Sequence, residues 1–199
     1  MRFISANFKQ TFVIAGNHEY YNETKTMSEI NIHLKHYFAQ FDNICFLDNS
    51  IEYYDGFCFI GTTLWSKITD PRYAINDVYS ILHFDHIKYN KLNAECVQFL
   101  ENTLQHNDNC IVITHHMPLK SLIHEKYKTT KMAPYNQWFY CDMHELIERH
   151  QSKIKCWIYG HTHTPSNTQV NEISFLCNPI GYPNENSNVD FGASVVMIT

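Results

Sequence analysis

The chain has 199 residues, of which 44% are apolar and 15% are aromatic, and its formal net charge is -5. A chain of this length can bury a substantial core as one domain, spanning residues 1–199. The acidic balance argues against a broad basic surface for nucleic acid or anionic membranes, while a locally basic groove stays open. No apolar run reaches the length of a membrane span, and residues 1–10 lack the apolar centre of a signal peptide. We therefore expect a cytoplasmic domain.

The seven cysteines give no sign of a disulfide framework. Their number is odd, no Cys-x-x-Cys pair occurs, and most of them lie within apolar runs. Free cysteine in such runs behaves as a small hydrophobic residue. We expect buried, reduced thiols.

The first predicted elements lead into and away from a polar loop. Thr11–Ala15 is a short apolar run typical of a buried strand, and it ends at Gly16-Asn17-His18-Glu19. From Met27 to Phe41, apolar residues recur at steps of three and four, which predicts an amphipathic helix. This helix would return the chain to the far edge of the sheet.

Short strands follow this helix. Ile44–Leu47 and Ile51–Tyr54 flank the polar residues 48–50, and Asp55-Gly56 turns the chain into Phe57–Ile60. We expect local antiparallel pairing among these strands. The change from a helical connection to hairpins indicates a second sheet packed on the first.

Residues 66–89 show no steady period and form a long irregular segment. Such a segment in a compact domain is usually functional, and it could form a wall or lid over the active edge. It includes His83-Phe84-Asp85-His86, for which a solvated loop is favoured over a group of ligands. Leu92–Leu104 then carries another helical stripe, which leads to a predicted strand at Cys110–Thr114.

After this strand come His115-His116-Met117-Pro118 and a lysine-rich segment that reaches residue 133. Solvation is the favoured role of these lysines, and attraction of an anionic substrate is the alternative. The remaining predicted elements are a helix at Trp138–His150, a strand at Cys156–Tyr159, a hairpin formed by Thr168–Val170 and Ile173–Leu176, and a closing strand at Ala193–Ile198.

Three of the predicted strands end in polar loops that carry histidine. The third of these loops is Gly160-His161-Thr162-His163, which follows Cys156–Tyr159. Residues i and i+2 of an extended segment point the same way, so His161 and His163 can present imidazole nitrogens to one small volume. Ligands collect at the carboxyl ends of strands in sheets with helical crossovers. We therefore expect the three loops to meet at one edge of the sheet.

The three loops occur in the order Gly16-Asn17-His18-Glu19, Thr114-His115-His116-Met117-Pro118 and Gly160-His161-Thr162-His163. In this order and strand context they resemble the last three motif blocks of the calcineurin-like metallophosphoesterases. Gly61-Thr62-Thr63-Leu64-Trp65 and Asn178-Pro179-Ile180-Gly181-Tyr182 look like further elements of the family. The resemblance implies an α/β fold, with a two-sheet β-sandwich flanked by helices. It also implies hydrolysis of a phosphomonoester or phosphodiester at a dinuclear metal centre.

The resemblance assigns roles to individual residues. Asn17, His115 and His161 would ligate one divalent metal ion, and His163 would ligate the other. His18 would contact the phosphate without binding metal and would aid the leaving group. Imidazoles and an amide oxygen suit manganese, iron or zinc. The residues that would support these groups or contact the substrate are Glu19, His116 and Asn178.

The family begins with an Asp-x-His block and a Gly-Asp-x-x-Asp block, and neither is found in this sequence. These blocks supply ligands of one metal and a bridging carboxylate, so one ion would keep three side-chain ligands and the other only one. Without the bridging carboxylate, the repulsion between two cations is poorly compensated. Loss of the N-terminal strand and helix unit would also expose apolar sheet edges, which recruit partners or drive oligomerisation.

Three explanations of the missing blocks are open. The chain is a truncated active phosphoesterase, a module that binds metal or a partner without turnover, or a protein completed by groups from another chain. The first is favoured, because the remaining motifs are intact. The metal core does not discriminate among substrates, since loop walls decide them. The acidic balance favours a small phosphoester over duplex nucleic acid.

Overall fold

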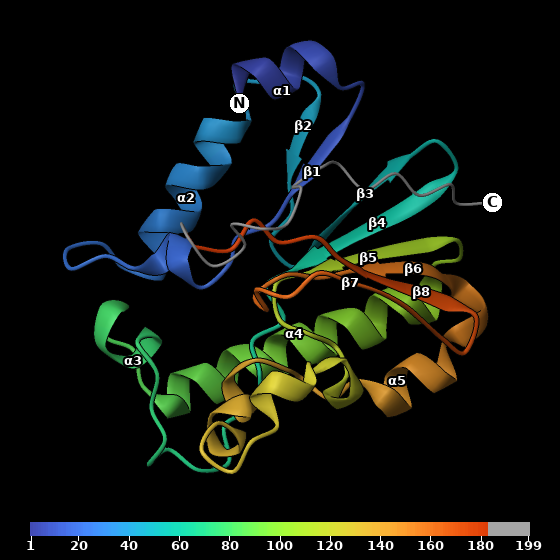
Figure 1. The fold of residues 1–199 in the computed structure, drawn as a ribbon. Coiled ribbons are helices and arrows are strands. Elements are labelled where there is room, and N and C mark those ends of the chain that lie inside the picture. The colour runs from blue at the N-terminus through green and yellow to red at the C-terminus, as the bar shows by residue number, and fades with distance from the viewer. Residues whose placement is uncertain (183–199) are drawn as a thin grey trace.

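The computed structural model describes residues 1–182, so the predicted closing strand at 193–198 lies outside the described residues. The described chain contains a six-stranded sheet, a two-stranded sheet and flanking helices, and the predicted α/β class is confirmed (Figure 1). The order of the larger sheet is β3-β4-β5-β6-β8-β7. Its strands are β3 (Ser50–Tyr54), β4 (Phe57–Thr62), β5 (Cys110–Thr114), β6 (Ile154–Ile158), β7 (Ser166–Val170) and β8 (Ile173–Cys177).

The inner strands of the larger sheet are parallel. β4, β5, β6 and β8 run in the same direction, whereas β3 and β7 pair antiparallel at the two outer positions. Thr62 pairs with Thr114 in the register of β4 and β5, so these two strands end level with each other. The loops that follow the parallel strands therefore leave the sheet at one edge, as expected for strands joined by crossovers.

The two-stranded sheet consists of β1 (Thr11–Val13) and β2 (Ile44–Phe46), which are parallel. The predicted antiparallel pairing of the second strand with the third is wrong, because β2 pairs with β1 and β3 pairs with β4. The helix between β1 and β2 carries the chain back, so both strands start at the same end and can only be parallel. Asn49, with φ of 46°, then redirects the chain into β3.

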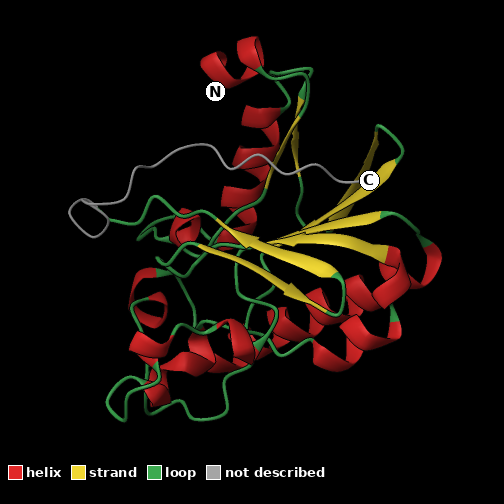
Figure 2. Cartoon of the chain, turned by 45° about the vertical axis from the view of Figure 1, so that its right-hand side comes forward, coloured by secondary structure: helices red, strands yellow, loops and turns green. Residues whose placement is uncertain are grey.

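Helices lie beside both sheets. α1 (Arg2–Asn7) and α2 (Met27–Phe38) accompany the two-stranded sheet, which stands apart from the larger sheet in Figure 1. α2 begins at a capping box, in which Thr26 and Glu29 each accept the other's backbone N–H. Both α4 (His86–His106) and α5 (His144–Arg149) lie under one face of the larger sheet (Figure 2).

The helical segments differ from their predicted bounds. α4 begins at His86, within the segment expected to be irregular, because Asp85 caps it by accepting the backbone N–H of Lys88 at 2.8 Å. Of the helix predicted at Trp138–His150, only α5 is α-helical, because the preceding 3-10 turn ends at Trp138 and residues 139–143 are not helical. The remaining short helices are α3 (Asp77–Ser80) and 3-10 turns at His18–Tyr20, Lys120–Leu122, Glu125–Tyr127, Ala133–Trp138 and Gln151–Lys153. Within residues 1–182, no helix has the length and apolar character to cross a membrane.

The core lies between the larger sheet and the helices beneath it. The buried side chains of α4 recur at steps of three and four, which confirms the predicted amphipathic stripe. All seven cysteines are free, and six of them are buried, as the sequence predicted. The buried residues of α4 are Tyr89, Asn93, Cys96, Leu100 and Leu104.

The two sheets meet where β4 ends. Phe12 of β1 stacks on Phe59 of β4, with ring centroids 3.9 Å apart. Gly61 permits this approach, because a Cβ there would lie 2.2 Å from the Cβ of Leu47. Just beyond β4, the hydroxyl of Thr63 donates to the carbonyl of Ala15 at 2.9 Å. The carboxyl end of β1 is thereby fixed beside the carboxyl end of β4.

Gly61→Ala tests this close approach. The added methyl would force the two sheets apart locally, so we expect the free energy of unfolding to fall by about 1–3 kcal/mol, the usual cost of overpacking. Chemical denaturation gives this value. Gly160→Ala is the control, because its methyl would meet its nearest neighbour only at 3.6 Å. Equal stability of the two variants would contradict this description of the packing.

Candidate metal centre

The backbone of the loop after β1 lies against the imidazole ring of His115. A Cβ at Gly16 would lie 2.6 Å from a ring carbon of His115, so no side chain fits there. The N–H of Gly16 donates to the carboxylate of Glu19 at 2.7 Å, and the N–H of Tyr20 donates to the carbonyl of Asn17. These bonds close the loop as a tight turn and direct the side chain of Asn17 inward.

Three side chains from three strand ends converge at this point. The Nε2 atom of His115, after β5, lies 2.9 Å from the Oδ1 atom of Asn17, after β1. The same Nε2 atom lies 2.9 Å from the Nδ1 atom of His161, after β6. Asn17 is buried, with 2% of its surface exposed. Two atoms that carry lone pairs thus lie 2.9 Å from a single ring nitrogen.

Burial keeps the two imidazoles neutral. The pKa values of His115 and His161 are well below the usual value for histidine, first because burial disfavours the charged form and then because the neighbouring histidines repel a proton. The Nε2 atom of His161 is also buried without a partner among the described residues. Buried polar atoms are normally hydrogen-bonded, and this nitrogen is not the one that faces His115.

The donor set is small. Within residues 1–182, no group of three or more His, Cys, Asp or Glu side chains is arranged to hold a metal ion. The third donor beside His115 and His161 is instead the amide oxygen of Asn17. Neutral imidazole and amide oxygen are ligands that first-row divalent cations accept, so the three residues fit such an ion.

The predicted extended backbone of the His-x-His loop is wrong, because the chain turns at His161. His161 has φ of 62°, in the left-handed region that side chains other than glycine rarely adopt. The N–H of Thr162 donates to the carbonyl of Gly160 at 2.7 Å, which closes a tight turn around His161. His161 consequently faces His115, whereas the ring of His163 packs edge-on against Tyr182, with centroids 4.6 Å apart. Strained backbone of this kind is common at functional sites.

His116 lies behind the convergent group. It is fully buried, and burial lowers its pKa to about 4. Its Nδ1 lies 3.1 Å from the carbonyl of Thr63, which can only accept, so Nδ1 carries the proton and Nε2 accepts from the hydroxyl of Tyr89 at 3.0 Å. Its ring lies 4.5 Å from that of His161. Both ring nitrogens of His116 therefore have partners within the protein.

The Gly61–Trp65 stretch packs against His116 and binds its backbone. The N–H of His116 donates to the carbonyl of Thr63 at 3.2 Å. The ring of Trp65 packs on that of His116, with centroids 5.6 Å apart. Leu64 turns the chain between these contacts with φ of 51°. The stretch therefore serves the site through packing and backbone bonds.

The other expected site residues lie at the rim. His18 is exposed, its ring packs on that of Tyr21 with centroids 4.3 Å apart, and its Nε2 lies 3.3 Å from the hydroxyl of Tyr182. Glu19 is exposed and holds the loop through Gly16. Asn178 is exposed directly after β8. His18, Glu19 and Asn178 are therefore all accessible from the surface.

One buried residue of the site escaped sequence reasoning. The carboxylate of Asp77 accepts a hydrogen bond from the side-chain amide of Asn17 at 2.7 Å, and Asp77 has no exposed surface. It lies in the segment expected to be irregular, and no pattern there marks it. By contrast, Asp85 of the same segment is the exposed cap of α4.

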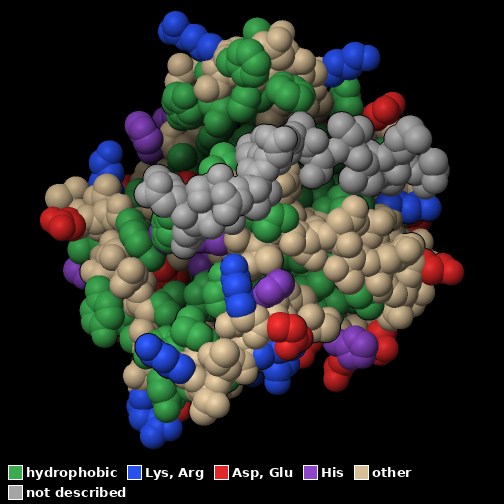
Figure 3. All heavy atoms as spheres, in the orientation of Figure 1, with side chains coloured by type: hydrophobic (Ala, Val, Ile, Leu, Met, Phe, Trp, Pro, Cys, Tyr) green, Lys and Arg blue, Asp and Glu red, His purple; other side chains and the backbone are tan. Residues whose placement is uncertain are grey.

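The lysine-rich segment borders a different hollow. Lys120 and Lys128 line a cavity of about 430 Å³ together with Tyr73 and Tyr140. Lys128 is paired with Glu125 at 2.6 Å. On the face shown in Figure 3, basic and acidic side chains are interspersed over the surface. This distribution favours solvation as the main role of the lysines.

Comparison with known proteins identifies the family. The family model described as calcineurin-like phosphoesterase matches residues 1–165, so the chain belongs to this family. An uncharacterized protein of Acanthamoeba polyphaga mimivirus is 32% identical over 206 residues, which cover 93% of this chain and 72% of that protein. The family supports phosphoester hydrolysis as the general reaction and divalent metal ions as its general cofactors.

A solved structure shares the fold. The crystal structure of phosphopantetheinyl hydrolase from Mycobacterium tuberculosis superposes with a TM-score of 0.66 and 13% sequence identity, over 90% of this chain and 72% of that chain. At this identity the likeness concerns the arrangement of strands and helices. It agrees with a metallophosphoesterase fold for this chain.

Gly16→Ala tests whether the convergent side chains depend on the close approach of the loop. The added methyl would push the ring of His115 away from Asn17, so we expect Mn²⁺ to bind roughly tenfold or more weakly, as when a supporting group of a metal ligand is lost. Titration calorimetry gives the affinity. Gly160→Ala again serves as control, since its methyl would lie 3.6 Å from the same ring. Equal affinities in the two variants would contradict this dependence.

Proposed function

We propose that this protein hydrolyses a small phosphoester, either a monoester or a diester, at a dinuclear centre of divalent metal ions. The convergence of Asn17, His115 and His161 carries the proposal, because these side chains meet within 2.9 Å contacts at the carboxyl edge of the sheet. In the proposal they hold one ion, and His163 holds the other. Manganese, iron and zinc all suit such donors.

The protonation of these residues supports the proposal. A histidine must be neutral to bind a cation, and burial keeps His115 and His161 in that form by lowering their pKa values. No proton has to be displaced from an imidazolium before binding. Phe139 packs against His161 with ring centroids 4.6 Å apart, which limits the access of water from that side.

In the proposed reaction, the metal ions and the side chains have separate roles. When bound, the ions supply a nucleophilic water at neutral pH and offset the negative charge of the phosphoryl group. The chain itself binds and orients the substrate at the rim. His18, which is exposed and follows Asn17 in the same loop, would donate a proton to the oxygen of the leaving group. Its packing on Tyr21 fixes the plane of the ring during this transfer.

The substrate class follows from charge. The chain carries a net charge of -5, and basic side chains do not form one continuous field on the face shown in Figure 3. A long polyanion gains most of its affinity from such a field. A small phosphoester therefore fits this surface better than duplex nucleic acid does.

His18→Ala tests the assignment of roles. We expect the variant to bind Mn²⁺ like the wild type and to hydrolyse p-nitrophenyl phosphate or its bis ester about 10²- to 10⁴-fold more slowly, the usual loss for a general acid. His115→Ala should lose both binding and hydrolysis. Elemental analysis gives the metal content and absorbance gives the rate. His33→Ala, which removes an exposed histidine of α2, is the control.

The outcomes separate the competing explanations. A wild-type chain that binds metal without hydrolysing either ester would favour a binding module over an enzyme. A wild-type chain that binds no Mn²⁺, Fe²⁺ or Zn²⁺ would remove the basis of the proposal. Full activity of His18→Ala would keep the hydrolase but reject His18 as proton donor.

A further inference from the structure

Asp77 is a buried carboxylate that forms no ion pair. It begins α3, has no exposed surface, and takes part in none of the ion pairs among residues 1–182. Its Oδ1 accepts hydrogen bonds from the Nδ2 of Asn17 at 2.7 Å and from the hydroxyl of Tyr21 at 2.6 Å. Its Oδ2 has no partner among the described residues. Aspartate is almost never fully buried without a charged partner, so this position calls for a functional reason.

The bond to Asn17 decides which end of the amide faces the histidines. A carboxylate can only accept hydrogen bonds, so the NH₂ group of Asn17 has to point toward Asp77. The amide oxygen then points toward His115, 2.9 Å from its Nε2. The flipped amide would set its oxygen against the carboxylate and turn two N–H groups toward the histidines. That orientation would repel both Asp77 and a cation.

Asp77 also binds Tyr21, whose ring contacts the exposed His18. Burial, and then the nearby Asp77, raises the pKa of Tyr21, so its hydroxyl keeps the proton that it donates to Asp77. The ring of Tyr21 packs on the ring of His18. One carboxylate oxygen therefore fixes Asn17 directly and His18 through the ring of Tyr21.

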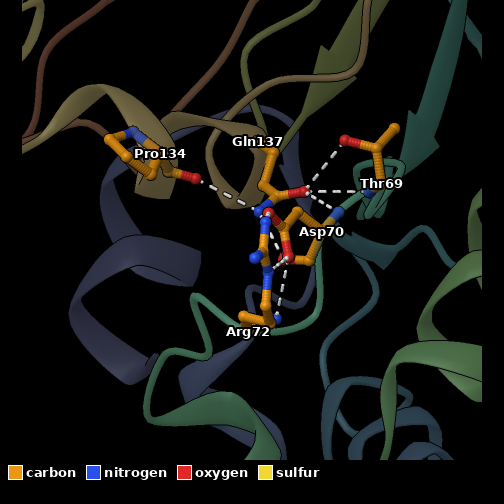
Figure 4. A network of polar contacts seen from close by, with 5 residues as sticks. All are labelled: Thr69, Asp70, Arg72, Pro134 and Gln137. Atoms are coloured by element: carbon orange, nitrogen blue, oxygen red, sulfur yellow. Dashed lines mark hydrogen bonds and ion pairs between the residues drawn. The ribbon is translucent and has the colours of Figure 1, made fainter.

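Hydrogen bonds attach both ends of the segment that carries Asp77 to other parts of the chain. Before α3, the side chain of Gln137 accepts the backbone N–H groups of Thr69 and Asp70 and donates to carbonyls of Asp70 and Pro134 (Figure 4). After α3, the N–H of Asn22 donates to the carbonyl of Ser80 at 3.0 Å. Both ends of the segment that carries Asp77 are thereby fixed to other parts of the chain.

We propose that Asp77 is a positioning residue, whose carboxylate orients the amide oxygen of Asn17 toward the cation and increases the negative charge on that oxygen. This inference rests on the proposed function, because it assigns Asn17 to the metal centre. A hydrogen-bonded group behind a ligand commonly fixes its orientation and raises its basicity. Asp77 would supply both effects from a position 60 residues along the chain from Asn17.

Asp77→Ala and Asp77→Asn test this role. In D77A the amide of Asn17 loses the carboxylate and is free to rotate, so we expect Mn²⁺ to bind roughly tenfold to a hundredfold more weakly. In D77N the new side chain still offers an oxygen to both donors without the charge, so the loss should be smaller. Titration calorimetry gives the affinities. Asp42→Ala, which removes an exposed aspartate, should bind Mn²⁺ like the wild type.

The side-chain amide of Asn17 provides a readout that needs no metal. Its NMR signals, assigned with Asn17→Asp, should shift and exchange faster with water in D77A, and should keep slow exchange in D77N. A folded D77A with wild-type affinity and unchanged Asn17 signals would overturn the inference. If D77A does not fold, unchanged affinity and unchanged signals in D77N would overturn it. If the wild type binds no Mn²⁺, Fe²⁺ or Zn²⁺, the proposed function fails, while the Asn17 signals still decide the role of Asp77.

Discussion

The close approach of the Gly16 backbone to the ring of His115 is the constraint on which the site depends. A Cβ at Gly16 would lie within 2.6 Å of that ring, and the approach places Asn17 in contact with His115. The same constraint recurs at Gly61, where the two sheets meet. Because glycine has no Cβ atom, Gly16 and Gly61 let loops from separate sheets share one small volume. Any larger residue would separate the groups that have to act together.

Burial then sets the charge of the groups that meet there. His115 and His161 stay neutral because their rings are withdrawn from water, and His116 supports His161 with both of its own nitrogens engaged. A cluster of exposed imidazoles would carry protons and repel a cation at mildly acidic pH. Packing by Trp65 and Phe139 therefore contributes to the chemistry as well as to stability.

The long segment between β4 and α4 places a buried carboxylate beside Asn17. The sequence suggested a wall or lid, which stays a prediction, and the one buried carboxylate of this segment lies behind Asn17. Asp77 joins Asn17 to Tyr21, whose ring packs on that of the exposed His18. The side-chain oxygen of Gln137 accepts the backbone N–H groups of Thr69 and Asp70 in this segment.

The sequence by itself determined the strands, their order and the polar loops at their ends, because apolar runs, glycine exits and three- or four-residue periods are local properties. Only the tertiary structure decided that β2 pairs with β1, since strand partners depend on where α2 returns the chain. It also decided the left-handed backbone of His161 and the burial of Asp77 beside Asn17. These features arise from contacts between residues far apart in the chain, and no local pattern encodes such contacts.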